Sequence, residues 1–307
     1  MERRRVGSLG VSVVGLGCNN FGMRLDAKDS ARVVHAALDA EINFFDTADI
    51  YGAGRSEEFL GVALGVWRAD VLIATKFGKP MDEQRRGARP EYIHRALEDS
   101  LRRLGTDYVD LYQLHDPDPA VPIADTLGAL DELVRAGKVR EIGCSNFTAA
   151  QIGEAALAAT NAHTAHFASV QNQYSLLHRE PETVVLAECK RVGAAFIPYF
   201  PLASGLLTGK YHRGEPAPQG SRLAGGGRTW QLDDAHLERV ERLRAFAIGR
   251  GHTLLELAIS WLLVRPVVSS VIAGATRPEQ VRANVAAAGW QLSTADLTAL
   301  DAIVPPL

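Results

Sequence analysis

The chain has 307 residues, 47% of them hydrophobic and 22% charged, with a formal net charge of -3. That composition predicts a large core in a single domain over residues 1–307, and it excludes a nucleic-acid partner, since no basic run exceeds Arg3-Arg4-Arg5. No signal-peptide or membrane-spanning segment is evident, and the three cysteines lack CxxC spacing, so we expect a cytoplasmic protein without membrane partner, disulfide or metal.

Apolar strand-like runs alternate with helix-like periodic segments along the chain, which is the pattern of parallel β/α units. Residues 4–9, with Gly7 near the turn, predict a short hairpin ahead of them. Helices are expected at 31–40, 57–64, 91–104, 123–136 and 254–264, and others begin near Thr148, Pro181 and Pro278. Strands are expected at 11–15, 43–46, 71–76, 108–114, 139–143, 169–171, 195–199 and 269–272. Eight such units predict an α/β fold of the closed (β/α)8 TIM-barrel type, with the active site at the C-terminal strand ends.

Residues 211–232 are rich in Gly, Pro, Ser and Arg and show no helical or strand periodicity. We expect a long mobile loop there, after the seventh strand. Two interpretations stay open, because composition does not separate them: a clamp that closes over a cofactor, and a flexible insertion.

Polar groups of four types follow the predicted strands. Asp46 ends one strand and Tyr51 comes just after it, while Lys76 and His115 end the next two. A phenol with a pKa of about 10 is a poor proton donor near neutrality, but a neighbouring ammonium lowers that pKa, and a carboxylate keeps the ammonium charged. Each residue alone has an ordinary explanation, such as a solvated strand end or a helix cap. Together they predict a site for proton transfer in which Tyr51 is the acid or base.

With these four residues in this order, the chain resembles the aldo-keto reductases, whose catalytic tetrad is an aspartate, a tyrosine, a lysine and a histidine. The resemblance continues through residues 143–147, 170–175, 198–202, 207–211 and 271–278. It implies that the hairpin caps the bottom of the barrel. It also implies an NADPH-dependent oxidoreductase that reduces an aldehyde or ketone to an alcohol, or catalyses the reverse, by direct hydride transfer.

The resemblance further implies that NADPH or NADP+ binds in extended form without a Rossmann domain. A dinucleotide fingerprint at residues 15–20 fails, because Asn20 stands where the third glycine belongs. Phe200 departs from many relatives, which have a small hydroxyl residue there. Ser145, Asn146 and Gln171 are expected at the carboxamide and Tyr199 on the nicotinamide ring, with Gly17, Cys18, Asn19, Phe200 and Pro201 also at the cofactor, Leu202, Ser204, Gly205, Leu206 and Lys210 along the pyrophosphate, Arg222 as a phosphate ligand, and Gly274, Thr276, Arg277, Gln280 and Asn284 at the adenosine end.

Several alternatives stay open. Arg277 precedes a helix N-terminus that can bind a phosphate, so it is a candidate phosphate ligand. The alternative is that Arg277 is a solvent-exposed charge at the start of the helix. A redox-sensing regulatory subunit on the same fold, binding NADPH with little turnover, is the alternative function; an aldolase or isomerase would leave the nicotinamide contacts without purpose. The substrate is expected to be a small carbonyl or alcohol compound. Asn20, Phe21, Met23, Tyr51, Phe77 and His178 are candidates for an apolar wall around it, and core packing is the alternative role for some of them.

Overall fold

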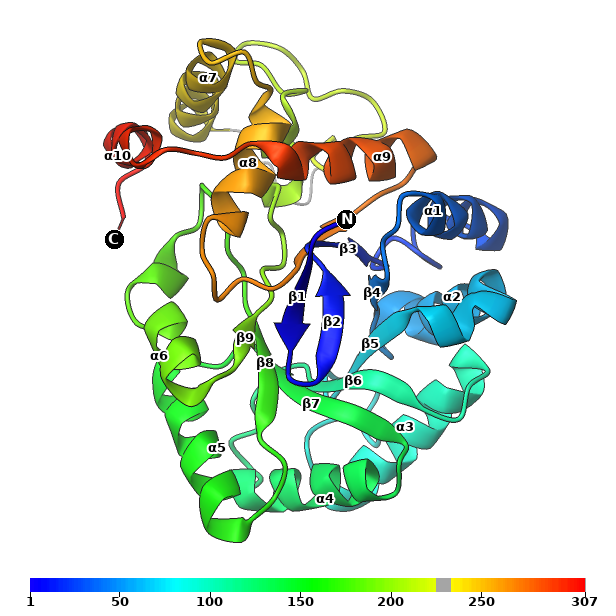
Figure 1. Cartoon of the computed structure of the whole chain (residues 1–307). Coiled ribbons are helices and arrows are strands. Elements are labelled where there is room, and N and C mark those ends of the chain that lie inside the picture. The colour runs from blue at the N-terminus through cyan, green and yellow to red at the C-terminus, as the bar shows by residue number, and fades with distance from the viewer. Residues whose placement is uncertain (225–232, 307) are drawn as a thin grey trace.

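The computed structural model describes residues 1–224 and 233–306. Within these residues, eight parallel strands form one sheet in the order β10-β3-β4-β5-β6-β7-β8-β9 (Figure 1). The Phe196 N–H donates to the Val267 carbonyl at 2.7 Å, and the Ser269 N–H donates to the Phe196 carbonyl at 3.0 Å, so the sheet closes just before β10. The predicted (β/α)8 barrel is confirmed. Its strands are β3 (Val14–Gly17), β4 (Phe44–Asp46), β5 (Leu72–Phe77), β6 (Val109–Leu114), β7 (Val139–Ser145), β8 (Phe167–Gln171), β9 (Ala195–Phe196) and β10 (Val271–Gly274).

A ring of helices surrounds the sheet, and most of them pack against the next helix of the ring (Figure 1). Thr148 and Thr253 begin two of them with capping boxes to Gln151 and Glu256. The helix expected near Pro181 is a short 3-10 turn followed by a helix that begins at Val185. The ring contains α1 (Ala27–Asp39), α2 (Arg55–Leu64), α3 (Pro90–Leu104), α4 (Ile123–Arg135), α5 (Ala149–Ala162), α6 (Val185–Val192), α8 (Leu254–Leu263) and α9 (Pro278–Ala286). Outside the ring, α7 (Asp234–Ile248) packs against α8, and α10 (Thr294–Ile303) packs against α7.

An antiparallel hairpin of β1 (Arg3–Val6) and β2 (Leu9–Ser12) lies across the N-terminal end of the barrel (Figure 1). Its apolar side chains Val6, Leu9 and Val11 belong to the cluster that fills the barrel interior. One boundary differs from the prediction, because Val11 pairs with Arg4 in the hairpin and the first barrel strand begins at Val14. Residues 11–16 are apolar apart from Ser12 and Gly15, so periodicity alone does not mark where the chain leaves the hairpin.

Side chains inside the barrel change from apolar to polar toward the C-terminal strand ends. Successive residues of a strand face opposite sides, so Phe44 and Asp46 both point inward. Phe44, Ala74 and Leu111 belong to the apolar interior cluster. Two residues further along each strand come Asp46, Lys76 and Gln113, and Lys76 pairs in register with Gln113. The polar residues therefore form a layer on top of the apolar core, facing the C-terminal opening.

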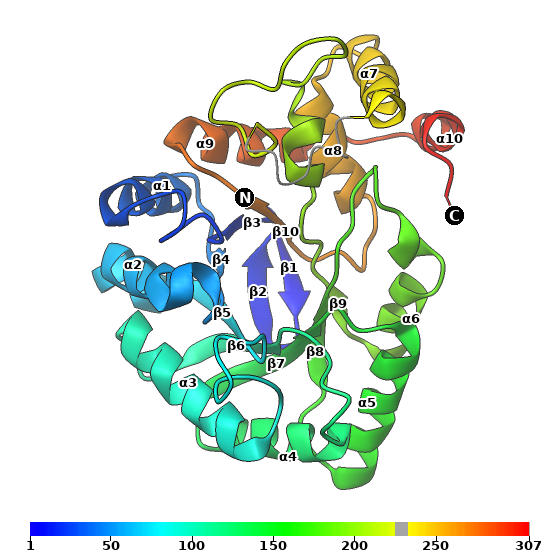
Figure 2. The ribbon, with the colours of Figure 1, turned by 180° about the vertical axis from the view of Figure 1, so that it is seen from behind.

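The predicted loop at 211–232 follows the seventh barrel strand, after a 3-10 segment, η4 (Ala203–Thr208). Its residues 211–224 form turns without helix or strand, and the remainder of the predicted loop, 225–232, lies outside the described residues. Figure 2, seen from the side opposite the hairpin, shows the segment passing close to α8 and α9. A search of the described helices finds none that is long and apolar enough to cross a membrane.

Candidate active site

A cavity of about 1180 Å³ lies at the C-terminal ends of the strands. Asp46, Tyr51 and His115 line it, while Lys76 is fully buried next to Asp46. Three of the four predicted catalytic residues thus face one space and the fourth supports them. Of the predicted cofactor residues, those that line the cavity are Gly17, Asn19, Ser145, Asn146, Gln171, Tyr199, Phe200, Pro201, Leu202, Ser204, Gly205, Lys210, Arg222, Gly274, Thr276, Arg277, Gln280 and Asn284.

Lys76 and Asp46 form a buried ion pair. The Lys76 Nζ lies 2.6 Å from Asp46 Oδ2 and donates a second hydrogen bond to the Thr47 carbonyl at 2.8 Å. Burial lowers the pKa of Lys76, but the charges of Asp46 and Tyr51 outweigh it, so the pKa is raised above its ordinary value. The ammonium therefore stays charged without contact with water.

Tyr51 lies above this pair, with the Lys76 Nζ 5.2 Å from the centre of its ring. Burial raises the pKa of Tyr51, the charge of Lys76 lowers it, and Asp46 raises it again, and the net direction is upward. Lys76 lowers the pKa of Tyr51 as the sequence predicts, but the effect of burial on this pKa is larger when no ligand is bound. Tyr51 is a protonated phenol at neutral pH.

The turn that carries Tyr51 depends on Gly52. Gly52 has a φ of 59°, and a Cβ at this position would lie 2.9 Å from the Phe21 carbonyl oxygen. An L-residue would be strained there in conformation and in contact. The glycine therefore lets the chain turn beside residues 21–22 and leaves the Tyr51 ring at the cavity.

His115 follows β6 and makes an edge contact with Tyr51, the ring centres being 5.8 Å apart. Burial lowers the pKa of His115 well below its ordinary value, and the charges of Lys76 and Lys79 lower it further. The imidazole is neutral at physiological pH, with one N–H to donate. Its Nδ1 is buried and has no hydrogen-bond partner in the described part of the chain.

Two glutamines hold the other oxygen of Asp46. The Gln171 Nε2 donates to Asp46 Oδ1 at 2.8 Å, and the Gln113 Nε2 donates to the same oxygen at 3.4 Å. The Gln171 Nε2 also lies 3.4 Å from Gln113 Oε1. Gln113 was not predicted, because it stands inside an apolar strand run. The sequence could have indicated it, because Gln113 stands two residues before His115 and alternate residues of a strand point to the same face.

Asn146 and Tyr199 bond to each other in this structure. Asn146 has a φ of 63°, and its Nδ2 donates to Asp116 Oδ1 at 2.6 Å and to the His115 carbonyl at 3.0 Å. The Tyr199 hydroxyl donates to Asn146 Oδ1 at 2.8 Å. A carboxamide bound to Asn146 would have to replace the Tyr199 bond, so the expected roles of these two residues stay predictions.

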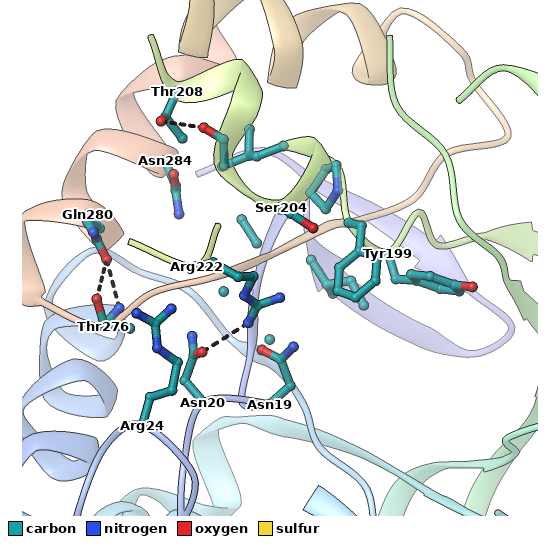
Figure 3. A pocket seen from close by; sticks show the side chains of 18 of the residues that line it. Asn19, Asn20, Arg24, Tyr199, Ser204, Thr208, Arg222, Thr276, Gln280 and Asn284 are labelled. Atoms are coloured by element: carbon teal, nitrogen blue, oxygen red, sulfur yellow. Dashed lines mark hydrogen bonds between the residues drawn. The ribbon is translucent and has the colours of Figure 1, made fainter. Parts of the chain in front are cut away.

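A group of cations lines the other end of the cavity (Figure 3). The Arg222 Nη2 donates to Asn20 Oδ1 at 3.0 Å, and the Arg24 Nη2 donates to the Gly220 carbonyl at 2.5 Å. Burial lowers the pKa of Lys210, and the charges of Arg24, Arg222 and Arg277 lower it further. Cations that disfavour one another in this way fit a bound polyanion such as a phosphorylated dinucleotide. Arg24 is an addition to the predicted set.

Gln280 and Asn284 of α9 line the same part of the cavity, together with Thr276, which precedes the helix (Figure 3). The Thr276 N–H and hydroxyl both donate to Gln280 Oε1, at 2.7 and 3.1 Å, so the side chain of Gln280 fixes the chain entering the helix. Arg277 stands at the N-cap without a side-chain cap hydrogen bond and lines the same cavity. The helix N-terminus and the cations thus face one space, as the adenosine phosphate would require.

Some predicted residues lie elsewhere. Cys18 and Leu206 are buried in the core and do not line the cavity; the Cys18 thiol donates to the Leu16 carbonyl, and burial raises the pKa of that thiol. Of the residues considered for an apolar substrate wall, Phe21 and Phe77 are fully buried, which agrees with the core-packing alternative, and neither Met23 nor His178 lines the cavity. The described residues contain no group of three His, Cys, Asp or Glu that could hold a metal ion.

A barrel of eight β/α units, with a tyrosine, a histidine and a buried lysine–aspartate pair at its open end, defines a class of barrel oxidoreductases. The chain belongs to the aldo/keto reductase family, whose family model matches residues 13–305. This membership was predicted from the strand-end residues and is confirmed. Members of the family use nicotinamide cofactors in general and act on small-molecule carbonyl substrates, and this protein is an oxidoreductase enzyme.

Individual relatives have varied names. The chain is 36% identical to a "Probable voltage-gated potassium channel subunit beta" of Arabidopsis thaliana, over 94% of this chain and 91% of the relative. It is 35% identical to "Aldo-keto reductase YhdN" of Bacillus subtilis (strain 168), over 99% and 94%. Among solved structures it is similar to the glycerol dehydrogenase AKR11B4 from Gluconobacter oxydans, with a TM-score of 0.85, 31% identity and coverage of 99% and 96%.

Proposed function

We propose that the protein is an NADPH-dependent oxidoreductase that reduces an aldehyde or ketone to an alcohol, or catalyses the reverse, with Tyr51 as general acid or base. The observation that carries this proposal is the 2.6 Å ion pair of Lys76 and Asp46 beneath Tyr51, at the floor of a cavity that has a cation group at its far end. The pair places a positive charge where a phenolate would form.

A bound nicotinamide supplies or accepts the hydride. In reduction, Tyr51 donates its phenolic proton to the carbonyl oxygen, and the ammonium of Lys76 stabilises the phenolate that remains. The neutral His115 donates its N–H to the same oxygen and orients the substrate. Because burial raises the pKa of Tyr51, the proton needed for reduction is in place at neutral pH. Oxidation needs the phenolate instead, so these residues favour reduction near neutrality.

The choice of NADPH over NADH rests on charge. Lys210, Arg222 and Arg277 line one end of the cavity, and an additional phosphate on the ribose would gain charge-assisted hydrogen bonds from such a group. Ser145, Asn146 and Gln171, at the ends of β7 and β8, are the residues proposed to hold the carboxamide.

A second candidate is a redox-sensing regulatory subunit that binds NADPH with little turnover. Its support is the 36% identity to a relative named as a probable potassium channel subunit. The two candidates differ in the turnover number, not in cofactor binding.

Purified protein tested with NADPH and 4-nitrobenzaldehyde at 340 nm decides between them. We expect turnover in the wild type and a loss of about 10²- to 10⁴-fold in kcat for Tyr51→Phe, the usual contribution of a general acid. NADPH binding, followed by fluorescence, should persist in the variant. Tyr108→Phe, at the N-terminal end of β6, is the matched control. Wild-type turnover in Tyr51→Phe would remove Tyr51 from the mechanism, and binding without turnover of any carbonyl would favour the regulatory subunit.

A further inference from the structure

The part of the cavity around Tyr51 and His115 is more polar than the sequence predicts. Where an apolar wall was expected, Lys79, Asn146 and Gln173 line the cavity together with the aliphatic Ile50. A carbonyl substrate held against Tyr51 therefore meets amide groups and a primary ammonium. Of these residues, Lys79 carries a full charge, which makes it the strongest candidate for selecting among substrates.

The chain places Lys79 at the cavity by a sharp turn after β5. Gly78 has a φ of 106°, and a Cβ there would lie 2.9 Å from the Leu114 side chain. The Gly87 N–H donates to the Gly78 carbonyl at 2.8 Å and holds the turn. The strand that buries Lys76 thus presents a second lysine three residues later, at the cavity wall.

Lys79 is incompletely neutralised. Its Nζ lies 3.4 Å from Asp116 Oδ2, and the two side chains are 33% and 43% exposed. The other oxygen of Asp116 accepts the 2.6 Å hydrogen bond of Asn146. A partly exposed pair of this length contributes little energy, and an ammonium has three N–H donors. Lys79 can therefore pair with a further anion without giving up Asp116.

The charge of Lys79 also reaches the catalytic residues. It contributes, after burial and Lys76, to the low pKa of His115. The Lys79 charge can act on the buried His115 ring only if the two are close and the medium between them screens charge weakly. A substituent of a substrate bound next to His115 lies in the same field.

We propose that Lys79 binds an anionic substituent of the substrate, so that the enzyme prefers carbonyl compounds bearing a carboxylate to neutral compounds of the same shape. This inference rests on the proposed function and names the substrate class for it. When the substrate covers the cavity, water is displaced from the ion pair, which strengthens the charged hydrogen bond. The competing explanation gives Lys79 only a structural role, in which it holds Asp116 and through it Asn146.

The test compares 4-formylbenzoate with 4-formylbenzamide, which have similar shapes and differ in charge. We expect the wild-type ratio of kcat/KM to favour the benzoate, and Lys79→Met to lower that ratio about tenfold. Lys79→Arg should keep the preference and Lys79→Glu should reverse it. Lys138→Met is the matched control, since Lys138 is also a half-exposed lysine in an ion pair, with Glu98, at the other end of the barrel.

The proposal would be overturned by a ratio that Lys79→Met leaves unchanged, and an equal loss on both aldehydes, which gives such a ratio, would assign Lys79 to the structural role. If the wild type reduces neither these two aldehydes nor 4-nitrobenzaldehyde, the proposed function fails and binding decides about Lys79. Thermal unfolding is then measured with NADP+ and either benzoate or benzamide. Protection by benzoate that disappears in Lys79→Met supports the anion site, and equal protection of wild type and variant, or none in either, contradicts it.

Discussion

The Lys76 Nζ and the Asp46 Oδ2 lie 2.6 Å apart, and their side chains are 0% and 3% exposed. If one member of the pair were removed, water could not solvate the charge that remains. Asp46 Oδ1 is occupied by Gln171, and Lys76 donates to the Thr47 carbonyl, so the remaining hydrogen-bonding capacity of the pair is largely used by the protein. This arrangement satisfies the conditions under which a buried ion pair is tolerated.

Removing one member of the pair should therefore cost more than removing both. We expect Lys76→Met to lower the free energy of unfolding by about 3–5 kcal/mol, because it leaves the Asp46 carboxylate buried and unpaired. The double variant Lys76→Met/Asp46→Asn should lose less. Urea unfolding followed by circular dichroism measures both. A double variant less stable than the single one would show that the charge of Asp46 is not the source of the cost.

Gln113 should matter for activity although it is not at the cavity surface. Gln113→Leu removes one donor to Asp46 and the acceptor near the Gln171 amide, so both residues lose orientation. We expect kcat to fall about tenfold, which corresponds to the loss of one hydrogen bond to a charged group. Tyr112→Phe, on the opposite face of the same strand, is the control. Equal rates for Gln113→Leu and wild type would mean that Gln171 and Lys76 position Asp46 unaided.

Arg277 should discriminate between the two dinucleotides. Arg277→Ala is expected to raise the Kd of NADPH at least about tenfold more than that of NADH, because a guanidinium–phosphate hydrogen bond is lost only from NADPH. Fluorescence titration at fixed ionic strength gives both constants. Arg282→Ala removes an exposed arginine of the same helix, so it controls for the general field of α9. Equal losses for NADPH and NADH would place Arg277 in solvent.

Asp49 should make stability depend on pH. Burial first, and the negative charge of Glu57 second, raise the pKa of Asp49 from 3.8 to about 7. Because the folded state holds this proton more tightly than the unfolded state, stability is lost as pH rises from about 4 to about 7 and is level above that. Asp49→Asn should remove this pH dependence, which amounts to roughly 4 kcal/mol in the free energy of unfolding at most. Unfolding at pH 5 and pH 8 tests it, with the exposed Asp39→Asn as control. A slope retained by Asp49→Asn would assign it to another group.

The barrel was predictable because its strands are apolar on both faces and its helices carry start signals. α3 begins at Pro90 and α4 ends at Arg135, each within one residue of the expected bound. The start of the first barrel strand at Val14 could not be predicted, because the hairpin and this strand share one apolar run. α7 and α10 were also not predicted, although Leu237, Val240 and Leu243 recur at helical spacing in α7.

In the site, residues that end strands were predictable and residues that depend on three-dimensional placement were not. Asp46 and His115 stand where apolar runs stop. Arg24 and Lys79 lie in turns, and only the closed barrel brings them to the cavity. Phe21 and Phe77 point into the core rather than the cavity, because the direction of a side chain after a strand end depends on turn geometry that spacing does not encode.

The hairpin of β1 and β2 covers the end of the barrel that lies opposite the cavity. Val6, Leu9 and Val11 fill that end of the barrel with buried apolar side chains. Residues 218–222 line the cavity, and Lys79 and Ile50 line it too. A nicotinamide cofactor and a carbonyl compound that share this cavity would therefore both have to enter and leave at the C-terminal ends of the strands.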